Sequence, residues 1–97
     1  MTKNFQSAKN TFSAYLNQDF DLLFGSADGA IRAFVQQSTP VEVSLVIADV
    51  ERILLMRLSE DDLQRFILQE LGSYYYFPNE WVSGEVWLRH VLDILRE

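Results

Sequence analysis

The side chains of this sequence that could do chemistry are two carboxylates, Asp19 and Asp21, and one imidazole, His90. Paired carboxylates serve general acid–base catalysis and glycoside hydrolysis, and an imidazole binds transition metals. Residues two apart in a helix or turn point in different directions, so Asp19 and Asp21 are not expected to face one another. His90 is the only histidine, there is no cysteine, and no carboxylate spacing completes a set of metal ligands. We therefore expect no catalytic residue, no metal site and no cofactor.

These three residues have structural interpretations instead. We predict that Asp19 caps a short turn through Phe24 and that Asp21 faces solvent or a nearby arginine. His90 is expected to be a partly buried or surface histidine without a ligand role. The sequence also lacks a glycine-rich phosphate loop and a serine–histidine–aspartate set in a suitable context. A small carboxylate-dependent enzyme is thus the least supported function.

The charge of the chain favours a protein partner. Fourteen acidic residues against eight lysines and arginines give a formal net charge of −6. Nucleic acids and anionic membranes require a basic surface, so neither is expected as a partner. A basic protein fits this charge, although solubility alone also explains an acidic surface. Glu60, Asp61 and Asp62 form a tight acidic group that suits the first turn of a helix and is also available to a basic protein.

Aromatic residues gather in segment 73–82, which has no helical periodicity and contains Tyr74, Tyr75, Tyr76, Phe77 and Trp81. Four consecutive aromatic side chains cannot all face one core, so at least one is expected at the surface. Tyrosine and tryptophan are also enriched in the binding hot spots of interfaces. We predict a binding surface for a protein partner that comprises Glu60, Asp61, Asp62, Tyr75, Tyr76, Glu80 and Trp81.

The elements that must position these residues are predicted to be helices. Apolar residues recur at steps of three and four from Phe5 onward, and alternation with a period of two is almost absent. Helices are expected to begin at Phe5, after residues 26–28, and after the capping residues Thr39, Ser59 and Ser83. The fold class is therefore an all-α compact bundle of about five helices, with segment 73–82 as an aromatic-rich irregular loop before the last helix.

Local signals refine this bundle. Thr39 followed by Pro40 and Glu42 predicts a capping box, and Gly25 and Gly72 predict left-handed helix ends. Trp87 lies on the apolar stripe of the last helix, whereas Trp81 lies in a polar loop and should be more exposed. The inward side of the helix after Thr39 is predicted to consist of Val43, Ile47, Val50 and Leu54, widened by Val46 and Ile53.

Length and hydropathy suggest one domain, residues 1–97, in the cytoplasm. Ninety-seven residues can bury a modest core. No apolar run approaches the roughly 20 residues that span a bilayer. The first residues also lack the basic start and apolar centre of a secretory signal.

One stretch, Tyr15-Leu16-Asn17-Gln18-Asp19-Phe20-Asp21, is followed by a glycine at position 25. Far downstream come Gly72, Pro78, Ser83, the pair Trp87-Leu88, and Val91. This pattern resembles the immunity proteins of bacterial contact-dependent growth inhibition, which carry a Tyr-Phe-His-Gln-Asp-Trp-Asp type box and a Trp-Leu pair in the last helix. Leu16, Asn17 and Phe20 replace the usual Phe, His and Trp.

The resemblance implies a binding module, not an enzyme. Its expected function is to neutralise, by stoichiometric association, the C-terminal toxin domain of a contact-dependent growth inhibition effector. Such toxins are often nucleases, whose basic grooves suit an acidic inhibitor, and the inhibitor is expected to be a monomer. The alternative is a helical adaptor or regulatory domain with a non-toxin partner. The resemblance assigns an organising role in the fold to Tyr15, Gln18, Asp19, Phe20, Asp21, Gly25, Trp87 and Leu88.

Overall fold

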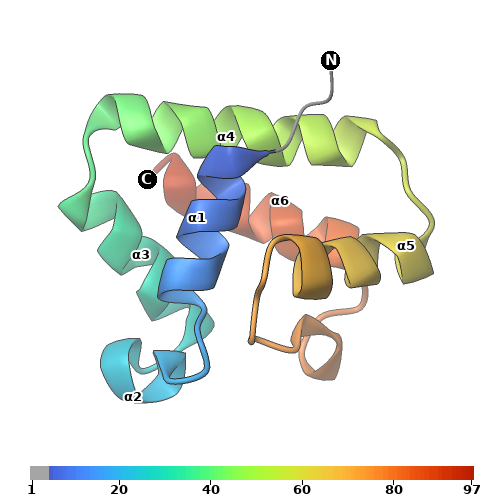
Figure 1. Ribbon diagram of the computed structural model, residues 1–97, viewed down its shortest axis with the longest axis horizontal. Helices are drawn as coiled ribbons and strands as arrows, with labels where there is room; N and C mark the ends of the chain where they lie inside the picture. Colours follow the sequence, from blue (N-terminus) through green and yellow to red (C-terminus); the bar gives the residue numbers. More distant parts are fainter. Residues whose placement is uncertain (1–4) are drawn as a thin grey trace.

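The computed structural model describes residues 5–97, and within this range the chain is helical without any strand (Figure 1). This confirms the predicted all-α fold. The α-helices are α1 (Gln6–Tyr15), α2 (Phe20–Phe24), α3 (Ala27–Gln37), α4 (Pro40–Leu55), α5 (Glu60–Arg65) and α6 (Gly84–Leu95). A π-helical turn, η1 (Phe66–Glu70), continues α5, and a short 3₁₀ turn, η2 (Phe77–Asn79), lies in the aromatic segment.

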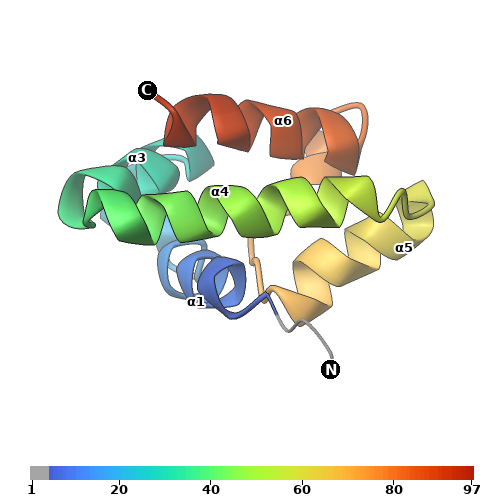
Figure 2. The same cartoon turned by 90° about the horizontal axis from the view of Figure 1, so that it is seen from above.

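Two long helices, α4 and α6, run side by side in opposite directions and form the centre of the fold (Figures 1 and 2). Helix α1 crosses α4 on the side away from α6, and α5 lies near the C-terminal end of α4. Helix α3 packs against both α1 and α6 at the other end. The short helix α2 and the loop before α6 both lie at the lower edge in Figure 1, α2 at the left and the loop at the right. No described helix is both long and apolar enough to cross a membrane.

The predicted capping residues begin their helices as expected. The hydroxyl of Thr39 accepts the Glu42 amide at 3.1 Å, and the Glu42 carboxylate accepts the Thr39 amide at 2.8 Å, which completes the capping box. Ser59 and Ser83 each accept a backbone amide three residues ahead, at 3.2 and 3.1 Å. These bonds satisfy amides that have no partner inside their own helix.

The core is centred on Trp87, as predicted from its place on the apolar stripe of α6. The indole is 1% exposed, stacks on Phe77 with 5.5 Å between ring centres, and meets the edge of Phe12 at 5.7 Å. Leu88 beside it is also fully buried. Stacked and edge-on aromatic contacts contribute about 0.5–1.5 kcal/mol beyond the area they bury. Segment 73–82 therefore supplies part of the core through Phe77, besides forming surface.

The inward face of α4 contains the predicted apolar residues and one carboxylate that was not predicted. Val46, Val50 and Ile53 are fully buried, but the other predicted inward residues, Val43, Ile47 and Leu54, are only half-buried. The buried face also includes a carboxylate, Asp49, which is 6% exposed. The predicted apolar residues are confirmed on the inward side, because Val43, Ile47 and Leu54 also pack against the core. The prediction did not include Asp49, which faces α1 and bonds to it.

Asp49 caps α1 from a distant part of the chain. Helix α1 follows Phe5, whose left-handed φ of +50° and apolar side chain offer no cap. Instead, Asp49 Oδ2 accepts the Ala8 amide at 3.0 Å, and Asp49 Oδ1 accepts from the Arg52 guanidinium. The same guanidinium lies 5.2 Å from the centre of the Phe5 ring. A negative charge at a helix N-terminus also interacts favourably with the helix dipole.

Candidate functional site

The turn between α1 and α2 is organised by Asn17, not by Asp19. Asn17 Oδ1 accepts the Asp19 amide at 2.8 Å, and Asn17 Nδ2 donates to the Ala14 carbonyl at 2.8 Å. Asp19 occupies the residue before α2 but makes no capping bond with its side chain, so the predicted cap was wrong. The Asn17 amide can both accept and donate, which a carboxylate cannot do. Asp19 and Asp21 are both exposed and are free to contact solvent or a partner.

The aromatic members of the same stretch hold α2 against the fold. The Tyr15 ring stacks on Phe24 at 5.6 Å, and its hydroxyl donates to Gln37 at 3.0 Å. The Phe20 ring meets the edge of Tyr75 at 5.7 Å. Gly25 then ends α2 with φ at +82°, a left-handed conformation that favours glycine. Gln18 is exposed.

Segment 73–82 carries a hydrogen-bonded chain of three side chains. Trp81 Nε1 donates to the Tyr75 hydroxyl at 3.0 Å, and that hydroxyl donates to Glu80 Oε1. Burial, followed by the hydrogen bond to Glu80, raises the pKa of Tyr75 well above its usual range, so the hydroxyl stays protonated into the alkaline range. Tyr75 is 8% exposed, which leaves it little surface for a partner. A direct contact of Tyr75 with a partner stays a prediction, and its hydroxyl holds Glu80 and Trp81 in place.

His90 links this loop to α3. Its ring lies 4.7 Å from Trp81, and its Nε2 lies 2.9 Å from Asp28 Oδ2. His90 is half-buried, as predicted for a structural histidine. Across the described residues, no three histidine or acidic side chains gather in a way that could hold a metal ion.

Two adjoining hollows lie between the α2–α3 region and segment 73–82. One, which we call the Trp81 hollow, has a volume of about 260 Å³ and is lined by Ser26, Ala27, Asp28, Tyr75, Glu80 and Trp81. The other, the Phe20 hollow, has a volume of about 390 Å³ and is lined by Phe20, Asp21, Gly25, Ser26, Ala27, Tyr75, Tyr76, Asn79 and Glu80. Asp21, Asp28 and Glu80 therefore line this face, and neither hollow has a lysine or arginine among its described lining residues.

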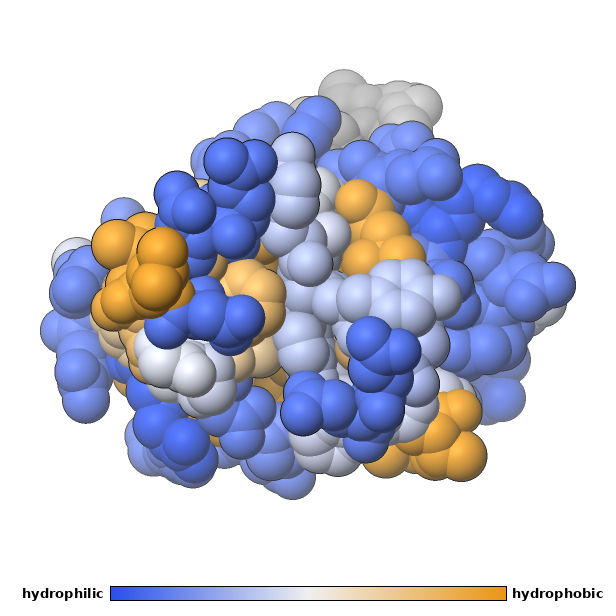
Figure 3. Space-filling model, turned by 90° about the horizontal axis from the view of Figure 1, so that it is seen from below, coloured by the Kyte–Doolittle hydropathy of each residue, from blue (hydrophilic) through white to orange (hydrophobic). Residues whose placement is uncertain are grey.

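The face that carries these hollows is mostly hydrophilic (Figure 3). Its hydrophobic patches are separate, and the one at the left lies over α2, where Leu22 and Leu23 are exposed. Tyr76, which lines the Phe20 hollow, is 48% exposed, and Trp81 is half-buried. Tyr74 is also exposed, so the expectation of at least one surface aromatic is confirmed.

Sequence reasoning missed Asp28, Leu22 and Leu23 as members of this surface. Asp28 looked only like a helix-start residue, because nothing in the sequence indicates its distance to His90. The two leucines had a usable signal: a helix that ends at Gly25 after five residues is too short to bury every apolar residue it contains.

The predicted acidic group lies elsewhere and has structural roles. Both oxygens of Glu60 accept the Gly84 amide, at 3.1 and 2.8 Å, so this carboxylate caps α6. Asp62 pairs with Arg65 at 2.9 Å. Asp61 is exposed and makes no side-chain hydrogen bond to the described residues. The group is thus divided between capping, an internal ion pair and one exposed carboxylate, and it lines neither hollow.

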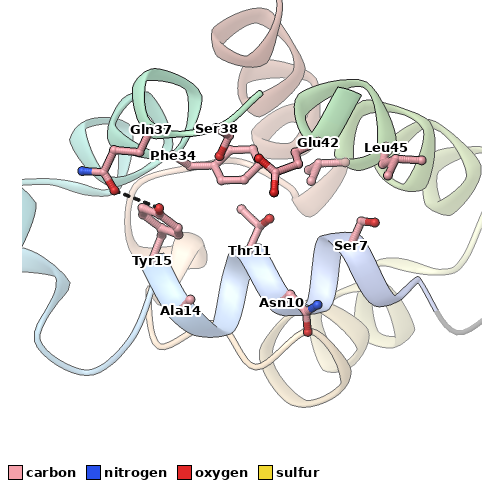
Figure 4. A pocket seen from close by; sticks show the side chains of 11 residues that line it. Ser7, Asn10, Thr11, Ala14, Tyr15, Phe34, Gln37, Ser38, Glu42 and Leu45 are labelled. Atoms are coloured by element: carbon pink, nitrogen blue, oxygen red, sulfur yellow. Dashed lines mark hydrogen bonds between the residues drawn. The ribbon is translucent and has the colours of Figure 1, made fainter. Parts of the chain in front are cut away.

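A larger groove, which Tyr15 lines at one end, lacks this combination of aromatic and acidic side chains. It has a volume of about 500 Å³ and lies between α1 and the corner where α3 meets α4 (Figure 4). Small polar side chains such as Ser7 and Thr11 line it, and the bond from Tyr15 to Gln37 crosses one end. Among the lining residues that the structure describes, Glu42 is the only charged one, and it belongs to the capping box. The groove therefore offers fewer charged side chains to a charged partner than the two hollows do.

Fold and surface together define a small acidic all-helical protein with two hollows that carry both aromatic and acidic side chains. The chain belongs to the CdiI immunity protein family, which matches residues 4–95. It is also similar to a chain in the crystal structure of the CdiA-CT/CdiI complex from Y. kristensenii, with 34% sequence identity and a TM-score of 0.92. That similarity covers 96% of this chain and 99% of the other. A comparison with curated proteins gives no match.

Proposed function

We propose that this protein binds one CdiA-CT toxin domain and neutralises it by direct association, without catalysis. The observation that carries the proposal is the face formed by the two hollows, where Asp21, Asp28 and Glu80 lie beside the aromatic side chains of Tyr76 and Trp81. Family membership supports an immunity role, and the similar chain comes from a complex of CdiA-CT with CdiI. An aromatic centre with surrounding charge is a common arrangement in tight protein interfaces.

The chemistry of the face suggests a basic toxin. A net charge of −6 attracts a positively charged surface over a distance of about one Debye length, roughly 8–10 Å at ordinary salt concentrations. Nucleases present such a surface because their substrate is a phosphate polymer. A nuclease is therefore the toxin activity that we propose, and the acidic face would occupy part of the surface that otherwise meets nucleic acid.

The test begins with the polypeptide encoded directly upstream of this gene. We expect its C-terminal domain to inhibit growth when expressed alone, and co-expression of this protein to restore growth. The two purified proteins should form a one-to-one complex whose association rate falls as salt concentration rises. Restored growth without a complex would contradict neutralisation by binding, and an upstream domain that lacks nuclease activity would remove the nuclease assignment alone.

Variants separate the two parts of the interface. Trp81→Ala should speed dissociation, because aromatic anchors contribute mainly to the lifetime of a complex. Replacing Asp61 and Asp62 by asparagine should lower the association rate if these carboxylates steer the toxin. Glu60 is unsuitable for this purpose because it caps α6. An unchanged association rate in the double variant would assign the acidic group on α5 to the fold alone.

A further inference from the structure

Most arginines of this protein already have an internal partner. Five ion pairs join an arginine to a carboxylate: Arg32 with Glu97, Arg52 with Asp49, Arg65 with Asp62, Arg89 with Glu85, and Arg96 with Glu51. The carboxylates that face the Trp81 hollow, Asp28 and Glu80, pair with none of these arginines. They are held instead by a histidine ring and a tyrosine hydroxyl.

Each of the two carboxylates keeps one oxygen available. Asp28 uses Oδ2 toward His90, and Glu80 uses Oε1 toward Tyr75; the other oxygen of each makes no hydrogen bond with the described residues. The Arg32 guanidinium, one turn along α3 from Asp28, bonds to Glu97 at 3.0–3.1 Å and makes no hydrogen bond to Asp28. The hollow is therefore flanked by two oriented acceptors without a permanent cation between them.

The size and walls of the hollow restrict what can enter it. A volume of about 260 Å³ lies below the roughly 300–1,000 Å³ of ordinary small-molecule pockets, so it suits one side chain better than a free ligand. Trp81 supplies an indole wall that is fixed by its bond to Tyr75 and its contact with His90. A planar cation is attracted to such a site in two ways: the carboxylates attract its charge, and its flat surface stacks on the aromatic face.

We propose that the Trp81 hollow receives one arginine side chain of the toxin, with its guanidinium against the Trp81 indole and within reach of the Asp28 and Glu80 carboxylates. This inference rests on the proposed function. Arginine fits better than lysine because its flat fork of donors can bond two carboxylates while it stacks on an aromatic ring. Tyr75 and His90 act as positioning residues, because each fixes one carboxylate and both contact Trp81.

The experiment measures the dissociation constant of the toxin domain encoded upstream for wild-type protein and for Asp28→Asn and Glu80→Gln. Both substitutions keep the size of the side chain, and both keep an oxygen for His90 or Tyr75. We expect each to weaken binding by about tenfold or more, the usual consequence of losing the charge from a charge-assisted hydrogen bond. Asp93→Asn is the matched control: it removes an exposed carboxylate of α6 outside both hollows and should change the dissociation constant by less than about twofold.

Arginine scanning of the toxin then identifies the occupant. In double-mutant cycles, one toxin arginine replaced by alanine should couple to both Asp28→Asn and Glu80→Gln, and replacing the same arginine by lysine should restore only part of the affinity. Circular dichroism and thermal unfolding of each variant separate a loss of contact from a loss of fold.

The outcomes distinguish this inference from the proposed function. If wild-type protein does not bind the toxin, the proposed function fails, and the arginine site fails with it. If wild-type protein binds but both variants bind within about twofold of it, the toxin interface lies elsewhere and only the arginine site is overturned. Coupling of Asp28 and Glu80 to a lysine, or to no basic residue of the toxin, would also overturn it.

Discussion

The substitution Asp49→Ala removes the carboxylate on α4 that accepts the Ala8 amide and pairs with Arg52. Phe5 makes no cap for α1, so among residues 5–97 no other side chain is seen to replace this bond. The hydrogen bond to the charged acceptor contributes about 1.5–3 kcal/mol net. The ion pair adds about 0.5–1 kcal/mol, since the Arg52 side chain is 39% exposed and can turn toward water. The expected loss of unfolding free energy is therefore about 2–4 kcal/mol.

Urea unfolding followed by far-ultraviolet circular dichroism measures this loss directly. For a domain of this size, each kcal/mol corresponds to about 4–8 °C, so the melting temperature should fall by at least about 8 °C. Asp93→Ala is the matched control, since it removes an exposed carboxylate from α6 and should change stability by no more than about 0.5 kcal/mol. Equal unfolding midpoints for the two variants would refute the capping role of Asp49.

Three other outcomes are expected. Glu60→Gln should lower the unfolding free energy by about 1–2 kcal/mol in urea, because this carboxylate caps α6, whereas Asp61→Asn should change it little. The raised pKa of Tyr75 means that the folded state holds its proton more tightly than the unfolded chain, so this stabilisation is complete below about pH 10 and declines above it. Urea unfolding at several alkaline pH values should show a weaker decline for Tyr75→Phe. Trp87→Ala should cost about 3–5 kcal/mol, while quenching by acrylamide in single-tryptophan variants should show Trp81 as the more accessible indole.

The helix starts were predictable because their signals are local. Thr39, Ser59 and Ser83 each bond to an amide three residues ahead, so residue type and spacing are sufficient to identify them. The burial of Trp87 was equally predictable from the sequence, since it follows from the apolar periodicity of one helix.

Contacts between distant residues were not predictable in this way. Asp49 and Ala8 are 41 residues apart, and Glu60 and Gly84 are 24 residues apart. In the sequence both acids look like exposed helix residues, because no local pattern indicates which distant amide they will meet. The candidate site was predicted only in part for the same reason: Tyr76, Glu80 and Trp81 were expected on it, but Asp28 reaches it through the packing of α3 against α6.

The two caps supplied from distant helices bear on how the chain folds. Helices α1 and α6 have 10 and 12 residues, lengths at which an isolated helix is marginal in water. One amide in the first turn of each helix, Ala8 in α1 and Gly84 in α6, finds its acceptor only when α4 or α5 is already in place. The Tyr74 amide likewise donates at 2.8 Å to Leu16, at the end of α1. Secondary structure and tertiary packing should therefore form in one cooperative transition, so a fragment that lacks α1 or α6 would lose the acidic face together with the fold.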